Sequence, residues 1–176
     1  MNTTGVVRRI DELGRIVIPK EIRKTMRIRD GENVEILTYN DQIILRKYSL
    51  VKRLGDFAQD FTDSIYSFLK HNIIITDVDS IVAISGSLKK DYQKKNLSEK
   101  MINLVYRREN ILEKHQKTLE IIEDDTIECT YVMKPIIVNS DIMGMVIILS
   151  LDDKITEIEE KVADIVANFF NKYLCD

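Results

Sequence analysis

Apolar and polar residues alternate in the first fifty positions over four short segments, which we predict to be strands: 5–10, 15–18, 33–39 and 42–48. Gly14 lies in the turn between the first two, where a positive φ is needed, and Asn40-Asp41 joins the last two as a hairpin. Pro19 suits the first position of a short helix, predicted over residues 20–26. The pattern therefore predicts a β-β-α-β-β module.

A module of this size buries little apolar area by itself. Its apolar side chains need a partner surface, and they are Val7, Ile10, Ile16, Ile18, Val34, Ile36, Ile43 and Leu45. The sequence therefore predicts a homodimer in which two copies share one barrel. We assign residues 1–50 to this module and residues 51–176 to a second domain.

The second domain begins and ends with amphipathic helices, predicted over about 51–70 and about 155–174, the latter capped by Thr156. Because no Gly/Ser-rich linker precedes it, the first helix predicts a stiff connection between the domains. Between the two helices the pattern predicts strands at 72–76, 80–84, 118–122, 126–138 and 142–151, and helices at 89–93 and 98–108. Strands flanked by helices indicate an α+β fold.

The two framing helices carry more apolar side chain than one small sheet covers, notably Phe57, Phe61, Phe169, Phe170 and Tyr173. Packing onto the sheet alone would bury some of them, and a helical bundle between subunits would bury the rest. We favour the bundle, because the N-terminal module independently calls for a dimer.

Charge is divided unevenly along the chain. The net charge of −3 combines ten Lys/Arg against seven Asp/Glu in residues 1–50 with 16 against 22 in the remainder. Residues 5–29 alone hold eight basic and three acidic residues. This division indicates that the first domain meets a polyanion and the second does not, although basic clusters are also common on solvated surfaces.

Guanidinium groups hold phosphate oxygens in a bidentate fork and read guanine edges, as recognition of duplex DNA requires. The candidate DNA-binding residues are Arg8, Arg9, Arg15, Arg23, Lys24, Arg46 and Lys47. Arg46 and Lys47 are the weakest members, because strand ends often carry such pairs. Asp11 is either a turn residue or an ion-pair partner that orients an arginine, and we favour the turn.

Enzyme chemistry has no support in the sequence, which lacks a nucleophile elbow, a phosphate-binding loop and a zinc-protease motif. Cys129 and Cys175 are isolated and are expected to be reduced thiols, and neither histidine has a plausible ligand cluster, so we expect no metal and no cofactor. The acidic pairs at 77–79, 124–125 and 152–153 suit turns. No membrane-spanning or signal segment is recognisable, which predicts a cytoplasmic, nucleoid-associated protein.

The run G-x-V-R-x-x-D-x-x-G-R-x-x-I-P-x-E-x-R, over residues 5–23, resembles the opening of AbrB-type transition-state regulators. The second half resembles a GAF domain, and residues 55–58, 85–92 and 131–149 carry this match. The resemblance implies a swapped-hairpin barrel made by two interleaved N-terminal halves, double-stranded DNA as partner, and a tetramer through the C-terminal helices. It also implies that the protein activates and represses genes of spore development.

By position, Arg8, Arg15, Arg23 and Lys24 match the DNA-contacting residues of the AbrB-type family, with Arg9, Arg46 and Lys47 as further candidates. The GAF-like half carries no recognisable ligand signature, so a small-molecule ligand stays unidentified. Two other functions stay open. An antitoxin uses the same barrel, but usually with a disordered acidic tail. A ligand-binding or structural assembly protein would carry the basic segment incidentally.

Overall fold

The computed structural model describes residues 5–152 and 154–175. It divides into two compact units, residues 1–48 and 49–176, here called the N-terminal and C-terminal units. The N-terminal unit holds the helix α1 (Lys20–Thr25) and an antiparallel hairpin of β1 (Val34–Tyr39) and β2 (Gln42–Lys47). Asn40 and Asp41 have φ angles of 44° and 60°, as a type I′ turn requires. The predicted hairpin is therefore confirmed.

The strands predicted at 5–10 and 15–18 are wrong for the single chain. Residues 5–19 have no regular secondary structure outside one turn, in which the amide of Asp11 donates to the carbonyl of Arg15 over 3.1 Å. Gly14 has the predicted positive φ, 75°. A strand exists only when a neighbouring strand completes its hydrogen-bond ladder. Residues 5–10 and 15–18, here called the arms, have no such neighbour within one chain.

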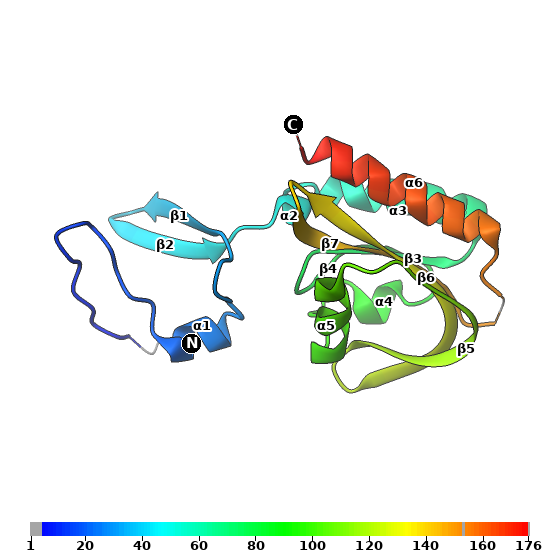
Figure 1. Ribbon diagram of the computed structural model, residues 1–176, viewed down its shortest axis with the longest axis horizontal. Helices are drawn as coiled ribbons and strands as arrows, with labels where there is room; N and C mark the ends of the chain where they lie inside the picture. Colours follow the sequence, from blue (N-terminus) through cyan, green and yellow to red (C-terminus); the bar gives the residue numbers. More distant parts are fainter. Residues whose placement is uncertain (1–4, 153, 176) are drawn as a thin grey trace. The chain divides into compact units, whose positions relative to one another are not determined.

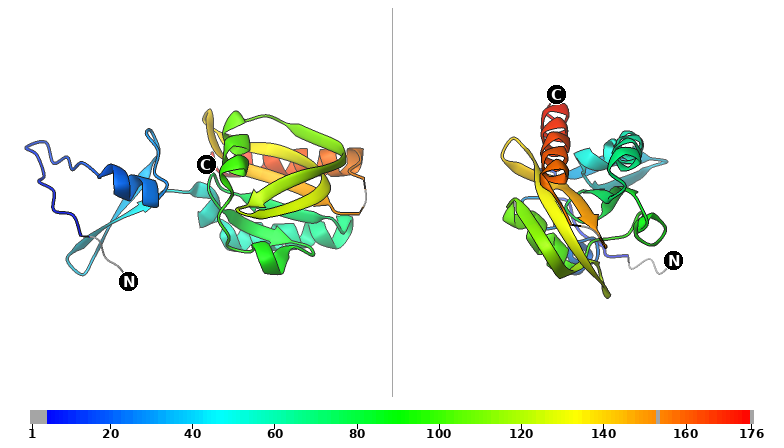
Figure 2. Two further views of the ribbon diagram at one scale, coloured as in Figure 1. Left: turned by 90° about the horizontal axis from the view of Figure 1, so that it is seen from below. Right: turned by 90° about the vertical axis from the view of Figure 1, so that its right-hand side faces the viewer.

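The C-terminal unit is built on a five-stranded antiparallel sheet, in the order β4-β3-β7-β6-β5. Its strands are β3 (Asn72–Thr76), β4 (Ile81–Ser85), β5 (Ile111–Ile122), β6 (Asp125–Val138) and β7 (Asp141–Ser150). β5 begins earlier than the predicted 118, because the pairing with β6 continues beyond an irregularity between Glu113 and Lys117 that breaks the two-residue period. β5 and β6 run side by side as a long, bent ribbon (Figure 2).

Helices cover both faces of this sheet (Figure 1). They are α2 (Leu50–Arg53), α3 (Gly55–Leu69), α4 (Lys89–Tyr92), α5 (Glu99–Arg107) and α6 (Glu157–Tyr173). Side chains of β3 alternate between two cores: Ile73 and Ile75 pack with residues of α3 and α6, and Ile74 packs with residues of α4 and α5. With both faces covered, β3 is buried at every position, as its uninterrupted apolar run indicates.

The segment that follows the N-terminal unit forms two helices, α2 and α3, so the prediction of one continuous helix over about 51–70 is wrong. Leu54 leaves helical geometry with φ −98° and ψ 18°, and a new helix begins at Gly55. Ser49 caps α2 by accepting a hydrogen bond from the amide of Lys52. Val51 is fully buried in the core of the C-terminal unit, which anchors the short helix there.

The C-terminal helix begins as predicted at Thr156. The Thr156 hydroxyl accepts from the amide of Ile158, and the Glu159 carboxylate accepts from the amide of Thr156 at 2.7 Å, which together form a capping box. At the other end of the neighbouring helix, Lys70 ends α3 in the left-handed conformation. The two helices meet where His71 Nδ1 lies 3.5 Å from Glu159 Oε1.

Candidate nucleic-acid interface

The turn over residues 11–15 is held by the side chain of Asp11. One carboxylate oxygen accepts hydrogen bonds from the backbone amides of Leu13 (3.0 Å) and Arg15 (2.8 Å), and the other forms an ion pair with Arg15 Nε at 2.7 Å. The bond from the Arg15 amide, followed by that from its side chain, lowers the pKa of the Asp11 carboxyl. Asp11 therefore plays both roles that the sequence left open, and it orients a guanidinium that stays 73% exposed.

The short helix α1 places Arg23 and Lys24 one position apart in its last turn. Arg23 Nη1 forms an ion pair with Asp30 at 2.5 Å, and the partner carboxylate is 94% exposed. Lys24 is exposed. Arg8 and Arg9 are exposed as well, in the extended arm that precedes the Asp11 turn.

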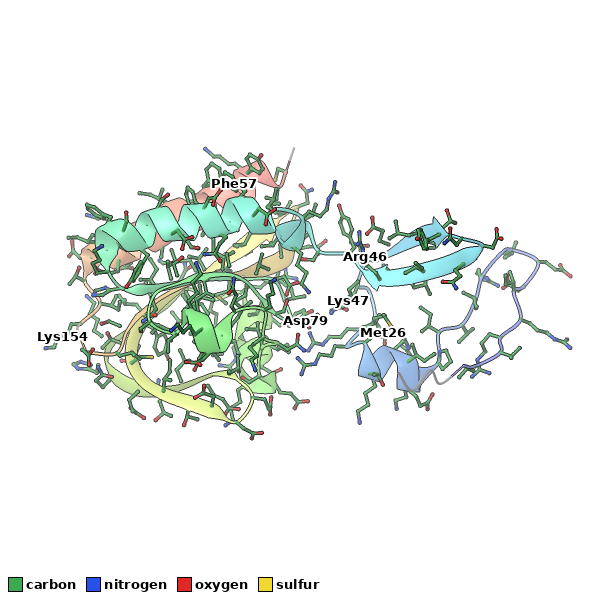
Figure 3. All side chains as sticks on the ribbon, turned by 180° about the vertical axis from the view of Figure 1, so that it is seen from behind. Met26, Arg46, Lys47, Phe57, Asp79 and Lys154 are labelled. Carbon is green, nitrogen blue, oxygen red and sulfur yellow. The ribbon has the colours of Figure 1, made fainter. Side chains whose placement is uncertain are left out.

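Arg46 and Lys47 are adjacent residues at the end of β2 (Figure 3), and neighbouring strand residues point to opposite faces. Arg46 is paired with its cross-strand partner Glu35 at 2.6 Å and remains 60% exposed. Lys47 is 20% exposed, lies 3.0 Å from Glu32 and donates to the carbonyl of Arg27 over 2.9 Å. Lys47 therefore ties the segment after α1 to the hairpin, whereas Arg46 presents its guanidinium to solvent.

Every candidate basic residue lies in the N-terminal unit, where four of the seven have an acidic partner: Arg15, Arg23, Arg46 and Lys47. The partners Asp30 and Glu35 were missed by sequence reasoning. Glu35 could have been found from the hairpin register, because it lies directly opposite Arg46. The pairing of Asp30 with Arg23 depends on the path of the chain after α1.

Other chemistries find little in the described part of the chain. Residues 5–152 and 154–175 hold no group of three His, Cys, Asp or Glu side chains that could bind a metal ion. Within the same residues, no helix is both long and apolar enough to cross a membrane. Cys129 is buried, Cys175 is exposed, and both are free thiols.

Two family models together span most of the chain. The family described as "Stage V sporulation protein T C-terminal, transcription factor" matches residues 53–174. The model for "Antidote-toxin recognition MazE, bacterial antitoxin" matches residues 7–53. Stage V sporulation protein T of Bacillus subtilis is 42% identical over 176 residues, which cover 99% of each chain. The chain belongs to the stage V sporulation protein T family.

The two parts of this chain also have separate relatives. The transition state regulatory protein AbrB of Bacillus subtilis is 50% identical over 48 residues, 27% of this chain and 50% of that protein. The structure of the cofactor binding GAF domain of the nutrient sensor CodY from Clostridium difficile superposes with a TM-score of 0.50 at 10% identity, covering 86% of this chain and 92% of that one. The second likeness concerns the fold alone. Both the AbrB-type resemblance and the mixed α+β fold are confirmed.

The protein is therefore a transcription regulator of sporulation genes, as the sequence predicted. The relative that matches over full length belongs to a transcription-factor family rather than to an enzyme family. Which residues contact DNA, and how copies of the chain assemble, are separate questions that the geometry of the N-terminal unit addresses.

Proposed function

We propose that the protein regulates transcription by binding double-stranded DNA as a homodimer, whose two copies of residues 1–50 interleave into a swapped-hairpin barrel. One observation carries the proposal: none of residues 5–48, all of which the structure describes, is buried. A folded domain needs a core, and this unit has apolar residues but nothing within itself to cover them.

The exposed apolar side chains lie on both parts of the N-terminal unit. Val7 is 94% exposed and Val17 74% exposed in the arms, and Ile36 and Ile43 are 68% and 69% exposed on the hairpin. Burying one such side chain contributes about 1.5–3 kcal/mol. The arms lack a neighbouring strand, and the apolar side chains of the hairpin are uncovered. In the proposed dimer the arms and the hairpin of the second copy supply both the strand neighbour and the apolar cover.

In the dimer each basic residue occurs twice, which produces a broad cationic surface. Arg8, Arg9, Arg15, Arg23 and Lys24 are the residues that we propose contact DNA. Arg46 is a secondary contact. Lys47 has a structural role in the hairpin, because it is largely covered, donates to a backbone carbonyl and forms an ion pair with a carboxylate. The acid partners of Arg15 and Arg23 orient the guanidinium groups before DNA arrives, which limits the entropy lost on binding.

We further propose that the C-terminal units pair, so that two dimers form a tetramer. Four stacked rings form an aromatic face on α3 and α6, defined by Phe57, Phe61, Phe169 and Tyr173; Figure 3 shows Phe57 on the outer side of α3. Phe57 is 38% and Tyr173 50% exposed, and Ile165 beside them is 65% exposed. An aromatic patch of this kind is typical of a protein interface.

The antitoxin model that matches residues 7–53 favours a second candidate function, neutralisation of a toxin by the same barrel. Antitoxins of this kind use a disordered segment to wrap their target. Here residues 49–176 form a compact unit with a two-sided core. The folded C-terminal unit therefore favours the regulator, bound to the chromosome.

Fluorescence anisotropy of a labelled duplex, titrated with full-length protein at about 50 and 200 mM salt, tests DNA binding. We expect affinity to fall steeply with salt, because phosphate neutralisation releases counterions. Arg15→Ala and Arg23→Ala should each weaken binding by about tenfold and reduce the salt dependence.

Lys161→Ala removes a cation from α6 of the C-terminal unit that is 77% exposed, close to the 73% of Arg15, and serves as the matched control. It should leave DNA affinity unchanged. Unaltered affinity in both arginine variants would overturn the site assignment, and absence of binding at low salt would overturn the proposed function.

A further inference from the structure

A cavity of about 230 Å³ opens in the C-terminal unit at the joint between α3 and the sheet. Its walls come from the end of α3 (Tyr66, Lys70), the start of β3 (Asn72), the segment before α4 (Ser87) and the residues that follow β7 (Asp152). The N-terminal unit takes no part in it. The lining is mostly polar, and neither DNA binding nor assembly requires it.

Asn72 is a buried polar residue of this cavity, with 6% of its surface exposed. Its Oδ1 accepts hydrogen bonds from the backbone amide of Leu88 (3.0 Å) and from the hydroxyl of Ser87 (3.2 Å). A backbone amide can only donate, so the oxygen must face Leu88 and the amide nitrogen must point the other way. That nitrogen has no hydrogen-bond partner among the described residues. An oriented donor is thus left for something in the cavity.

Gly86 makes this arrangement possible. Its φ is +126°, and a Cβ at this position would lie 2.3 Å from Asn72 Oδ1. Any larger residue would push the amide out of place. The loop of residues 86–88 therefore wraps the Asn72 oxygen closely, which fixes the direction of the nitrogen.

The lining also holds a lysine and an aspartate, together with His71, Ser150 and Leu151. Lys70 follows α3 in the left-handed conformation, and its ammonium lies 5.8 Å from the centre of the Tyr66 ring. Asp152 is exposed and forms no ion pair within the described residues. Neither side chain forms an ion pair with an acidic or basic neighbour among the described residues, whereas Lys89 is paired with Asp63.

We propose that this cavity binds a small zwitterion that carries a carboxylate and an ammonium group. The carboxylate is held by the Lys70 ammonium and the Asn72 amide nitrogen, and the ammonium by the Asp152 carboxylate. The Tyr66 ring forms an apolar wall. A volume of about 230 Å³ lies below the range of about 300–1,000 Å³ that is typical of ligand pockets, which favours a small molecule.

Calorimetric titration of the full-length protein tests the proposal with probes that separate the two charges. Acetate and methylammonium each carry one charge, and glycine, β-alanine and γ-aminobutyrate carry both at increasing separation. We expect at least one zwitterion to bind about tenfold more tightly than either single-charge probe, because linking the charges makes the second contact intramolecular. Equal weak binding of all five, or none, would overturn the proposal.

Three variants locate the binding. Lys70→Gln and Asp152→Asn change exposed side chains and should each weaken binding of the preferred zwitterion about tenfold. Asn72→Asp keeps the oxygen for Leu88 but replaces the donor nitrogen, so it should abolish binding. Lys90→Gln, an exposed position on α4, is the matched control. Undiminished binding in both exposed variants, with melting temperatures unchanged, would show that the zwitterion binds elsewhere and the assignment is wrong.

Discussion

The two units of this protein differ in whether a single chain can complete them. In the C-terminal unit a sheet is covered on both faces, and its strands β3 and β7 are buried almost throughout. In the N-terminal unit no residue from 5 to 48 is buried, although its strands also carry isoleucine and leucine. Apolar content therefore does not tell whether a segment folds alone. What matters is whether its neighbours in the same chain can cover it.

The largest effect is expected where the self-sufficient unit is packed most closely. A Cβ at Gly144 of β7 would lie 1.9 Å from the carbonyl oxygen of Thr76, so Gly144→Val must displace β3. We expect a loss of about 3 kcal/mol or more in the free energy of unfolding, measured by denaturant titration.

Gly55→Ala provides the control for that substitution. Its Cβ would meet only the Val82 side chain, at 4.0 Å, and alanine favours the helix. Stability should stay equal or rise by about 0.5 kcal/mol. A Gly144→Val protein as stable as the wild type would contradict the close approach of β3 and β7 at this position.

The next effect separates a shared core from a solvated surface in the N-terminal unit. Ile36 is 68% exposed in one chain, so Ile36→Ser should cost less than about 0.5 kcal/mol if the chain acts alone. If a second copy covers it, as we propose, the dimer dissociation constant should rise by tenfold or more, measured by sedimentation equilibrium.

Thr38→Ser, on the same strand and the same face, is the control for Ile36→Ser, because it removes a methyl group from an exposed position without removing an apolar side chain. Dimerisation should be unaffected. An Ile36→Ser protein that dimerises as well as the wild type would contradict the swapped barrel.

A smaller effect concerns the Asp11 turn, which one chain completes by itself. The lowered pKa of Asp11 means that its ionised form stabilises the turn at and above the ordinary value of 3.8, and that this contribution is lost as pH falls through the lower folded value. The amide resonances of Leu13 and Arg15 should therefore shift in NMR spectra below about pH 4.

Asp11→Asn should abolish that acid transition and weaken DNA binding a few-fold at neutral pH, because Arg15 loses its ion pair. If the Leu13 amide resonance of this variant still shifts below pH 4, the transition belongs to another carboxyl group.

The smallest effect is expected for Arg46→Ala. Its pair with Glu35 is 60% exposed on the arginine side, and such surface pairs contribute about 0–1 kcal/mol. Unfolding should change within that range, and DNA affinity should fall less than in Arg15→Ala. A larger loss of DNA affinity for Arg46→Ala than for Arg15→Ala would place the end of β2 at the centre of the DNA-binding surface rather than at its margin.

Local signals predicted several elements well. Asn40-Asp41 predicted the hairpin because both residues tolerate positive φ, and Thr156 predicted the start of α6 because its hydroxyl caps a helix. The break at Leu54 was not predictable, since the apolar spacing continues through it. On the N-terminal side of the break Val51 packs into a core that only the folded sheet creates.

The candidate sites show the same division. The basic residues could be identified from the sequence because a charge pattern needs no fold to be visible. Lys70 and Asn72 could not be grouped with Asp152, since Asp152 lies far along the chain from both and was interpreted as a turn residue. Only the meeting of α3, β3 and the end of β7 places them around one cavity.

By itself the sequence determined the family, the order of the strands and helices from residue 72 onward, the basic character of the first unit and the positions where caps and turns act. The caps, turns and charge pattern depend on neighbours within a few residues. The tertiary structure decided what depends on distant contacts. It shows which arms lack a strand partner, how β5 extends past its irregularity, where the connector breaks, and which way the Asn72 amide faces. Burial and ladder pairing are set by residues far along the chain, or in another copy of it.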